Sequence, residues 1–188
     1  MITGDRKTAL LDSAQDLIQT VGVNAMSYND LSLAVGIRKA SIHYHFPKKD
    51  DLVEALLQRC GNDYGQHYRT VACSEDPVMD KLRAIAQIFE NSLMEGKICT
   101  VGMLSVESTT LSETIRERLK ATINSSVAII EGIFIQGVSD RTFPRTLDTT
   151  LAARAFHDFL LGAQVIARAL DDPEHFRTSA NEYLRLLG

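Results

Sequence analysis

Residues 27–52 have the sequence SYNDLSLAVGIRKASIHYHFPKKDDL, and this stretch decides the fold. Its pattern predicts a helix, a tight turn at Gly36, a short second helix and the start of a third. Ser27 can cap the first helix, and Asp30, three residues later, completes an approximate capping box. Gly36 can adopt the left-handed conformation that allows the chain to reverse after so short a helix.

The second of these helices presents a polar face. Ile37 and Ile42 are expected to anchor it from behind. A short helix that is held by its back and displays basic, hydroxyl and aromatic groups suits the major groove of DNA. The residues left to face outward are Arg38, Lys39, Ser41, His43 and Tyr44.

The run GIRKASIHYHFPKKDDL at residues 36–52 closely resembles the DNA-binding signature of the tetracycline-repressor (TetR) family of bacterial transcription regulators. Helical patterns continue along the rest of the chain without strand-like alternation, and they predict nine helices. The resemblance implies an all-α fold with a three-helix helix-turn-helix head and a helical body. We therefore expect a DNA-binding domain at residues 1–47 and a ligand-binding and dimerisation domain at residues 48–188.

Two residues depart from the family pattern. His43 occupies the place of a tyrosine that usually reaches a DNA phosphate, and neutral imidazole can still donate one hydrogen bond. Arg38 replaces the small hydroxyl residue that commonly caps the recognition helix. We expect the cap to be lost, which costs about 1 kcal/mol, and a cation to be gained.

The predicted DNA contacts divide into two groups. Lysine and arginine can reach guanine acceptors, whereas tyrosine and serine can serve phosphates or base edges. Lys39, Ser41 and Tyr44 are expected in the groove, with Arg38 beside them. Carried over from the family, the contacts to the DNA backbone are Tyr28, His43, His45 and Lys49, although His45 is equally well explained as a brace for the turn.

The charge distribution agrees with contact to DNA at one end only. The whole chain has a net charge of −4. Residues 1–49 hold six lysines and arginines against four aspartates, a balance of +2, whereas residues 50–188 have a balance of −6. A basic head on an acidic body suits a protein that touches phosphates through the head. Ordinary charge scatter is the alternative explanation.

The helix predicted from Asp148 to about Leu170 carries more apolar surface than one packed side requires. Gly162 and Ala163 would allow another helix to approach closely. A core helix of a monomer is the alternative. We expect a homodimer, as the resemblance also implies, whose two heads read a pseudo-palindrome with half-sites about 34–36 Å apart or a small multiple of it. The expected interface residues are Leu151, Ala155, Phe159, Gly162, Ala163, Ile166 and Leu170.

The remainder of the body is larger than DNA binding alone requires, so we expect it to take a small-molecule signal. Apolar walls with a few polar groups are typical of small-molecule sites. Glu107 and His157 stand out because a buried carboxylate or imidazole needs partners. Each candidate is also explained by plain core packing. The candidates are Phe89, Leu93, Cys99, Met103, Glu107, Phe134, Phe156 and His157.

The cysteines suggest an alternative function. Cys60, Cys73 and Cys99 form no CxxC motif, which argues against a zinc ribbon or a thioredoxin-like site. The segment at residues 97–107 resembles a pattern in family members that sense electrophiles or oxidants through a cysteine. Lys97 and a nearby helix start would lower the pKa of the Cys99 thiol. The protein would then be a thiol-based redox repressor, unless Cys99 is simply a small hydrophobe at a helix start.

A small helical enzyme is a remote alternative. His43 and His45 are two residues apart on a predicted helix and therefore point to different sides. The sequence has no HExxH motif, no paired carboxylates, no GxSxG motif and no phosphate-cradling glycine loop. We expect no enzyme activity, no metal and no cofactor.

The sequence predicts a cytoplasmic protein. No apolar run approaches the roughly 20 residues that span a bilayer, and the amphipathic N-terminus lacks a signal-peptide core. We therefore expect a dimeric transcriptional regulator, a repressor that a small-molecule effector releases from its operator. Its expected partners are double-stranded operator DNA, an unidentified effector and a second copy of the chain, without a membrane.

Overall fold

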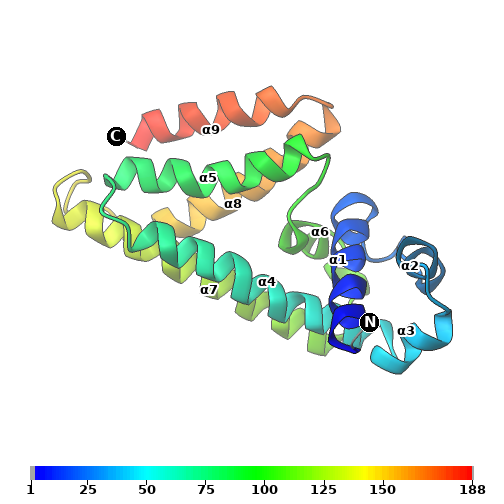
Figure 1. Cartoon of the computed structure of the whole chain (residues 1–188). Coiled ribbons are helices and arrows are strands. Elements are labelled where there is room, and N and C mark those ends of the chain that lie inside the picture. The colour runs from blue at the N-terminus through cyan, green and yellow to red at the C-terminus, as the bar shows by residue number, and fades with distance from the viewer. Residues whose placement is uncertain (1–2, 188) are drawn as a thin grey trace. The chain divides into compact units, whose positions relative to one another are not determined.

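The computed structural model describes residues 3–187, with side chains for residues 6–187. This described part contains nine α-helices, one short 3₁₀ helix and no strand, which confirms the predicted all-α fold (Figure 1). In chain order the helices are α1 (Thr3–Val21), α2 (Tyr28–Val35), α3 (Lys39–His45), α4 (Lys49–Ala72), α5 (Val78–Met94), α6 (Thr100–Val106), the 3₁₀ helix η1 (Ser108–Thr110), α7 (Glu113–Ser139), α8 (Thr149–Ala169) and α9 (Pro173–Leu187).

Local capping signals account for several of the helix ends. Ser27 and Asp30 form the reciprocal capping box at the start of α2. Gly36 ends α2 with a φ of 70°, in the left-handed region that glycine occupies without strain. The Asp148 side chain accepts a hydrogen bond from the Leu151 N–H and so caps α8. These three predictions are confirmed.

Two helix starts differ from the sequence-based prediction. The pair Asp76-Pro77 predicts a cap followed by a proline at the first helical position, but Pro77 itself occupies the N-cap of α5, and the Asp76 carboxylate accepts a hydrogen bond from the Ser74 hydroxyl. The glycine-containing stretch at residues 95–102 predicts a break before a short helix, but α6 already begins at Thr100 and includes Gly102. The reversal before α6 occurs earlier, at Gly96, whose φ is 73°.

The chain divides into two compact units. The first comprises the chain up to Cys60 together with Thr100–Thr122, and the second comprises Gly61–Cys99 and the chain from Ile123 onward. This division by packing does not follow the boundary predicted at residues 47 and 48, because the long helices α4 and α7 each contribute residues to both units. The predicted boundary separates functions, and it stays a prediction.

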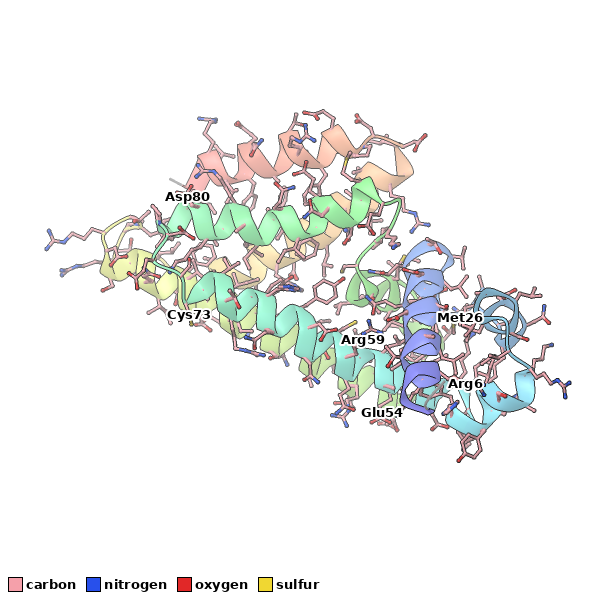
Figure 2. The ribbon with its side chains drawn as sticks, in the orientation of Figure 1. Arg6, Met26, Glu54, Arg59, Cys73 and Asp80 are labelled. Carbon is pink, nitrogen blue, oxygen red and sulfur yellow. The ribbon has the colours of Figure 1, made fainter. Side chains whose placement is uncertain are left out.

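The first unit holds α1, α2, α3, α6 and the adjoining parts of α4 and α7. Helix α1 packs against α2 and α6, and α2 packs against α3. Two ion pairs add to the apolar packing: Arg59 of α4 contacts Asp12 at 2.5 Å, and Glu54 contacts Arg118 at 3.1 Å (Figure 2). The fully buried apolar residues include Leu10, Ala14, Ile18, Leu31, Ile42, Leu52 and Leu56.

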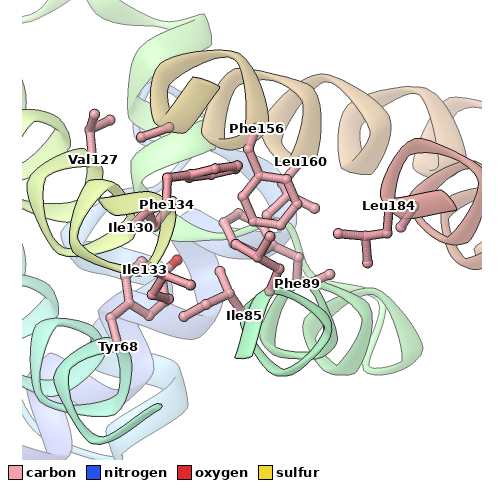
Figure 3. Close-up of a cluster of buried hydrophobic side chains, with 14 of the residues drawn as sticks. Tyr68, Ile85, Phe89, Val127, Ile130, Ile133, Phe134, Phe156, Leu160 and Leu184 are labelled. Carbon is pink, nitrogen blue, oxygen red and sulfur yellow. The ribbon is translucent and has the colours of Figure 1, made fainter. Parts of the chain in front are cut away.

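The second unit is built on α5, α8 and α9, which pack against one another. Its core is rich in aromatic rings (Figure 3). Phe134 stacks on Phe143 with ring centroids 5.3 Å apart and meets Phe156 edge-on at 6.3 Å. Lys81 is buried in this unit, and its ammonium donates to the Ala72 carbonyl at 2.9 Å and to Gln136 Oε1 at 2.7 Å. The core therefore accommodates this one cation by hydrogen bonding its head group.

Helix α7 is long and apolar enough to span a membrane when judged by length and composition alone, with a mean hydropathy of 1.3. It is the one such helix among residues 3–187. In the sequence, Glu131 interrupts the apolar run of this helix, so no uninterrupted stretch of that length is present. Ile130, Ile133 and Phe134 of this helix are buried in the core of the second unit, and 28% of its most apolar window is buried inside the chain.

Candidate nucleic-acid interface

Helices α2 and α3 form a helix-turn-helix whose turn is fixed by hydrogen bonds. The Ile37 N–H donates to the Ser32 carbonyl at 3.2 Å, and the Ser32 hydroxyl donates to the Ile37 carbonyl at 2.6 Å. Ile42 is fully buried and holds α3 from behind, with Phe46 buried directly after the helix. Burying an isoleucine of this kind stabilises the fold by about 1.5–3 kcal/mol. The opposite face of α3 is left to solvent.

Four of the eight residues predicted to contact DNA are exposed on or beside α3. These residues are Arg38, Lys39, His43 and Tyr44. Tyr44 is 78% exposed, so its ring is accessible to a binding partner. Arg38 occupies the N-cap of α3 and makes no side-chain capping bond, as expected. A tyrosine, a lysine and an arginine displayed together match the donor set that DNA recognition uses.

The other four predicted residues are half-buried, and two of them have structural partners. They are Tyr28, Ser41, His45 and Lys49. The Tyr28 hydroxyl donates to the Phe46 carbonyl at 2.8 Å, and burial raises the pKa of Tyr28 to about 12, with a smaller contribution from Asp51. The Tyr28 hydroxyl therefore keeps its proton, but that proton is already committed to a backbone acceptor.

Lys49 connects the start of α4 to the segment before α2. Its ammonium donates to the Met26 carbonyl at 2.6 Å. Burial lowers the pKa of Lys49, and the opposing charges of Glu107 and Asp30 limit that decrease. An ammonium carries three donors, so the bond to Met26 leaves capacity for a phosphate. A DNA contact by Lys49 stays a prediction.

The two histidines of α3 lie against aromatic rings. His43 packs edge-on to Tyr28 with centroids 4.9 Å apart, and its Nδ1 lies 3.4 Å from the Pro47 carbonyl. His45 lies edge-on to Tyr44 at 5.2 Å. Both roles of His45, as a brace for the turn and as a phosphate contact, stay predictions.

A shallow hollow of about 630 Å³ lies where the start of α2, α3 and the start of α4 meet. Lysine and histidine donors around it suit the oxygens of a phosphate. Asn24, Met26 and Asn29 were not predicted from the sequence to line this surface, because they lie outside the recognition helix. The path of the backbone brings them beside it. Its lining residues are Asn24, Met26, Ser27, Tyr28, Asn29, Lys39, His43, Pro47 and Lys49.

The residues predicted to contact an effector do not all share one unit. Phe89, Leu93, Cys99, Phe134, Phe156 and His157 belong to the second unit. All of these are buried except Cys99, which is half-buried, and the three phenylalanines belong to the apolar core. Met103 and Glu107 belong to the first unit, where the Glu107 carboxylate accepts hydrogen bonds from the Val23 and Asn24 amides.

His157 is the most distinctive polar residue of that group. Its side chain is 3% exposed, and burial lowers its pKa, although Asp158 acts in the opposite direction. Within the described part of the chain, Nδ1 has no hydrogen-bond partner and lies 3.6 Å from the Asp158 carboxylate. Gln164, two turns further along α8, is also buried and spans from the Phe89 carbonyl to the Cys99 N–H.

All three cysteines lie in the described range, and none is in a disulfide: Cys60 is buried, Cys73 is exposed and Cys99 is half-buried. Lys97, whose charge was expected to activate Cys99, forms an ion pair with Glu95 at 3.0 Å. Among the described residues no group of three or more histidine, cysteine, aspartate or glutamate side chains is placed to hold a metal.

Comparison with known proteins agrees with this geometry along most of the chain. Residues 10–56 match the family described as "Bacterial regulatory proteins, tetR family", and residues 78–183 match "Tetracyclin repressor-like, C-terminal domain". The transcriptional repressor KstR2 of Rhodococcus jostii is 26% identical over 154 residues, which cover 81% of this chain and 75% of KstR2. The repressor DhaR of a Mycobacterium species is 24% identical over 157 residues, which cover 82% of this chain and 76% of DhaR.

Solved structures show the same fold. A TetR-family regulator from Agrobacterium tumefaciens aligns with a TM-score of 0.93 and 26% identity, covering 99% of both chains. The structure of AibR in complex with isovaleryl coenzyme A and operator DNA aligns with a TM-score of 0.73 and 21% identity over 97% of both chains, a likeness of fold alone. Since the C-terminal match alone spans more than half of the residues, the chain belongs to the TetR family of bacterial regulatory proteins.

Proposed function

We propose that this regulator is a homodimeric transcriptional repressor that binds a pseudo-palindromic operator and is released by a small-molecule effector. The observation that carries the proposal is the face of α3, where Lys39 and Tyr44 are exposed on a helix that Ile42 anchors. Repression is supported by the relatives KstR2 and DhaR, which are described as transcriptional repressors. The site of action is the cytoplasm, where operator DNA is accessible.

The surface of α8 supports dimerisation. Phe156 and Leu160 are fully buried inside the chain, yet Leu151 is 63% exposed and Ile166 is 51% exposed on the same helix. A Cβ added at Gly162 would meet no atom within 4 Å in the described part of the chain. A helix that is apolar on two sides requires a second partner. All seven residues predicted for the interface are exposed or half-buried.

The effector binds in the helical body in this proposal. Support comes from buried polar groups within apolar surroundings, above all His157 Nδ1, which has no hydrogen-bond partner among the described residues. The relative AibR was solved with isovaleryl coenzyme A and operator DNA together. Effector binding that favours one of two conformations shifts the population away from the DNA-bound form.

The redox alternative at Cys99 is not favoured. Its chemical argument required a positive charge beside the thiol, and the Lys97 ammonium is paired with Glu95. The enzyme alternative is not favoured either, because the matched family is described as bacterial regulatory proteins.

The test is selection from a pool of genomic fragments by the purified protein at moderate salt. We expect enrichment of a pseudo-palindromic sequence. Replacing Lys39 or Tyr44 with alanine should weaken binding to that sequence by roughly 10- to 100-fold, since a base-edge contact contributes about 1–3 kcal/mol. The matched control is Lys120→Ala, an exposed lysine on α7, and it should bind as the wild type does.

Two outcomes would contradict the proposal. One is weak, sequence-independent binding that disappears as salt rises, which is typical of a purely electrostatic contact. The other is an enriched sequence whose affinity is unchanged by Lys39→Ala and Tyr44→Ala together, because the recognition surface would then lie elsewhere.

A further inference from the structure

The turn between α1 and α2 is held by side chains that come from two distant segments. The Glu107 carboxylate, directly after α6, accepts from the Val23 N–H at 2.6 Å, and both of its oxygens lie 3.3 Å from the Asn24 nitrogen. The Lys49 ammonium, at the start of α4, donates to the Met26 carbonyl at 2.6 Å. A carboxylate and an ammonium group thus hydrogen-bond to backbone groups of the same turn.

The backbone of this turn is shaped around the carboxylate. Gly22 has a φ of +92°, and a Cβ at that position would lie 2.8 Å from Glu107 Oε1. Any other residue would therefore be strained at this φ and would displace the Glu107 carboxylate from its present position. A second bond supports the contact, because the Asn24 amide donates to the Thr110 hydroxyl at 2.9 Å.

The direction of α2 and α3 depends on this turn. Helix α2 begins at Tyr28, two residues after Met26, and α3 follows it through the fixed turn at Gly36. Carboxylate-to-amide hydrogen bonds are charge-assisted and stronger than bonds between neutral groups. A shift of Glu107 would therefore move the turn at Val23 and Asn24, which precedes α2 and the recognition helix α3. Figure 1 shows α6 beside α1 in this unit.

Helix α6 is secured at both of its ends. Cys99, the residue before it, donates its backbone N–H to Gln164 Oε1 at 2.9 Å within the second unit. Gln164 is fully buried and also donates to the Phe89 carbonyl at 3.0 Å. Glu107, the residue after α6, is bonded within the first unit as described above.

We propose that Glu107 is a positioning residue for operator binding: it holds the turn at Val23 and Asn24 and so sets the orientation of α2 and α3. The inference rests on the proposed dimeric operator binding, and it assigns Glu107 to the head, whereas the sequence alone suggested a contact with the effector. A residue that only stabilises the fold would affect every DNA sequence equally.

The experiment measures affinity for two DNA duplexes, the selected operator and the same operator with its half-site spacing changed by one base pair. Glu107→Ala should weaken binding to the native spacing by roughly tenfold, as loss of a charged hydrogen bond predicts, and should weaken binding to the altered spacing much less. Glu107→Gln, which keeps an acceptor, should fall between. Glu113→Ala, an exposed glutamate at the start of α7, is the matched control and should preserve the discrimination.

Equal losses on both duplexes would overturn the inference, because they indicate a structural role alone. Wild-type affinity of Glu107→Ala on both duplexes would also overturn it. Amide hydrogen exchange provides a readout without DNA: exchange at Val23 and Asn24 should become faster in Glu107→Ala, and unchanged exchange would refute the contact. Failure to select any operator with the wild-type protein would instead contradict the proposed function.

Discussion

At the scale of single residues, the phenol of Tyr28 joins α2 to the end of α3. Its O–H donates to the Phe46 carbonyl at 2.8 Å, and its raised pKa of about 12 keeps the proton in place. Tyr28→Phe removes the bond and leaves the half-buried carbonyl without this donor. We expect the free energy of unfolding to fall by about 1 kcal/mol, measured by urea denaturation, with operator affinity nearly unchanged.

The matched control for this change is Tyr44→Phe, because Tyr44 is 78% exposed and its hydroxyl should not affect stability. The opposite pattern would contradict the structural role of Tyr28. If Tyr28→Phe kept full stability and lost operator affinity tenfold, the phenol would have to leave Phe46 and contact a phosphate in the complex.

His157 makes stability depend on pH, because burial lowers its pKa below the ordinary value of 6.5. The unfolded chain then takes up a proton at a higher pH than the folded chain. The contribution is therefore fully present above pH 6.5 and is progressively lost as the pH falls from 6.5 towards the folded pKa. We expect the free energy of unfolding to be lower at pH 5.5 than at pH 7.5, and His157→Gln to reduce that difference.

The control is Asn62→Gln, a change at an exposed residue on α4 that has no titratable group, which should leave the pH dependence unchanged. Both variants are compared with the wild type by urea denaturation at the two pH values. A wild-type stability difference that survives intact in His157→Gln would mean that other groups titrate and that His157 does not.

At the scale of elements, α2 and α3 differ in how their first turns are capped. Ser27 closes a capping box on α2, whereas Arg38 makes no side-chain cap on α3. Ser27→Ala should lower the free energy of unfolding by about 1 kcal/mol, and Arg38→Ser should raise it by a similar amount. Urea denaturation at neutral pH measures both.

The double variant of Ser27→Ala and Arg38→Ser should have nearly wild-type stability, because effects at independent sites add. Destabilisation by Arg38→Ser alone would show that the arginine makes a contact that the fold needs. Operator binding measures the second predicted role of this position, since Arg38→Ser also removes a cation that is predicted to contact DNA.

Local signals explain which elements the sequence predicts well. Ser27, Gly36 and Asp148 each act on the helix end at which they lie. Their roles can therefore be predicted from the residues next to them in the sequence. The hydrogen bonds from Val23 to Glu107 and from Lys49 to Met26 join positions far apart, and in each a backbone group is one partner. Backbone groups are the same at every residue and leave no signature in the sequence. The structure alone therefore reveals how the turn before α2 is held.

The same reasoning explains the candidate sites. The outward face of α3 follows from helical periodicity once Ile42 is recognised as the anchor. The residues that contact the effector stay a prediction, because Phe134 and Phe156 have the composition of a pocket wall and the packing of a core. Composition does not distinguish an apolar wall that meets a ligand from one that meets another side chain.

At the scale of the whole molecule, two recognition helices must be held at one spacing to read a pseudo-palindrome, and a monomer reads only half of it. The exposed apolar side of α8 is the surface that would join the two copies. Ile166 is 51% exposed there. Placing a carboxylate at the centre of an apolar interface buries an unpaired charge, which is strongly unfavourable.

Ile166→Glu should therefore convert the dimer to a monomer at micromolar concentration, as measured by sedimentation equilibrium, and should reduce operator affinity to that of a single half-site. Ile135→Glu on α7 is the matched control, because Ile135 is 54% exposed and lies on another helix. It should remain dimeric and bind the operator normally. If Ile166→Glu stayed dimeric while Ile135→Glu dissociated, the interface would include α7 in place of α8. The spacing of the two heads, and with it the operator that they read, would then be set by a different helix.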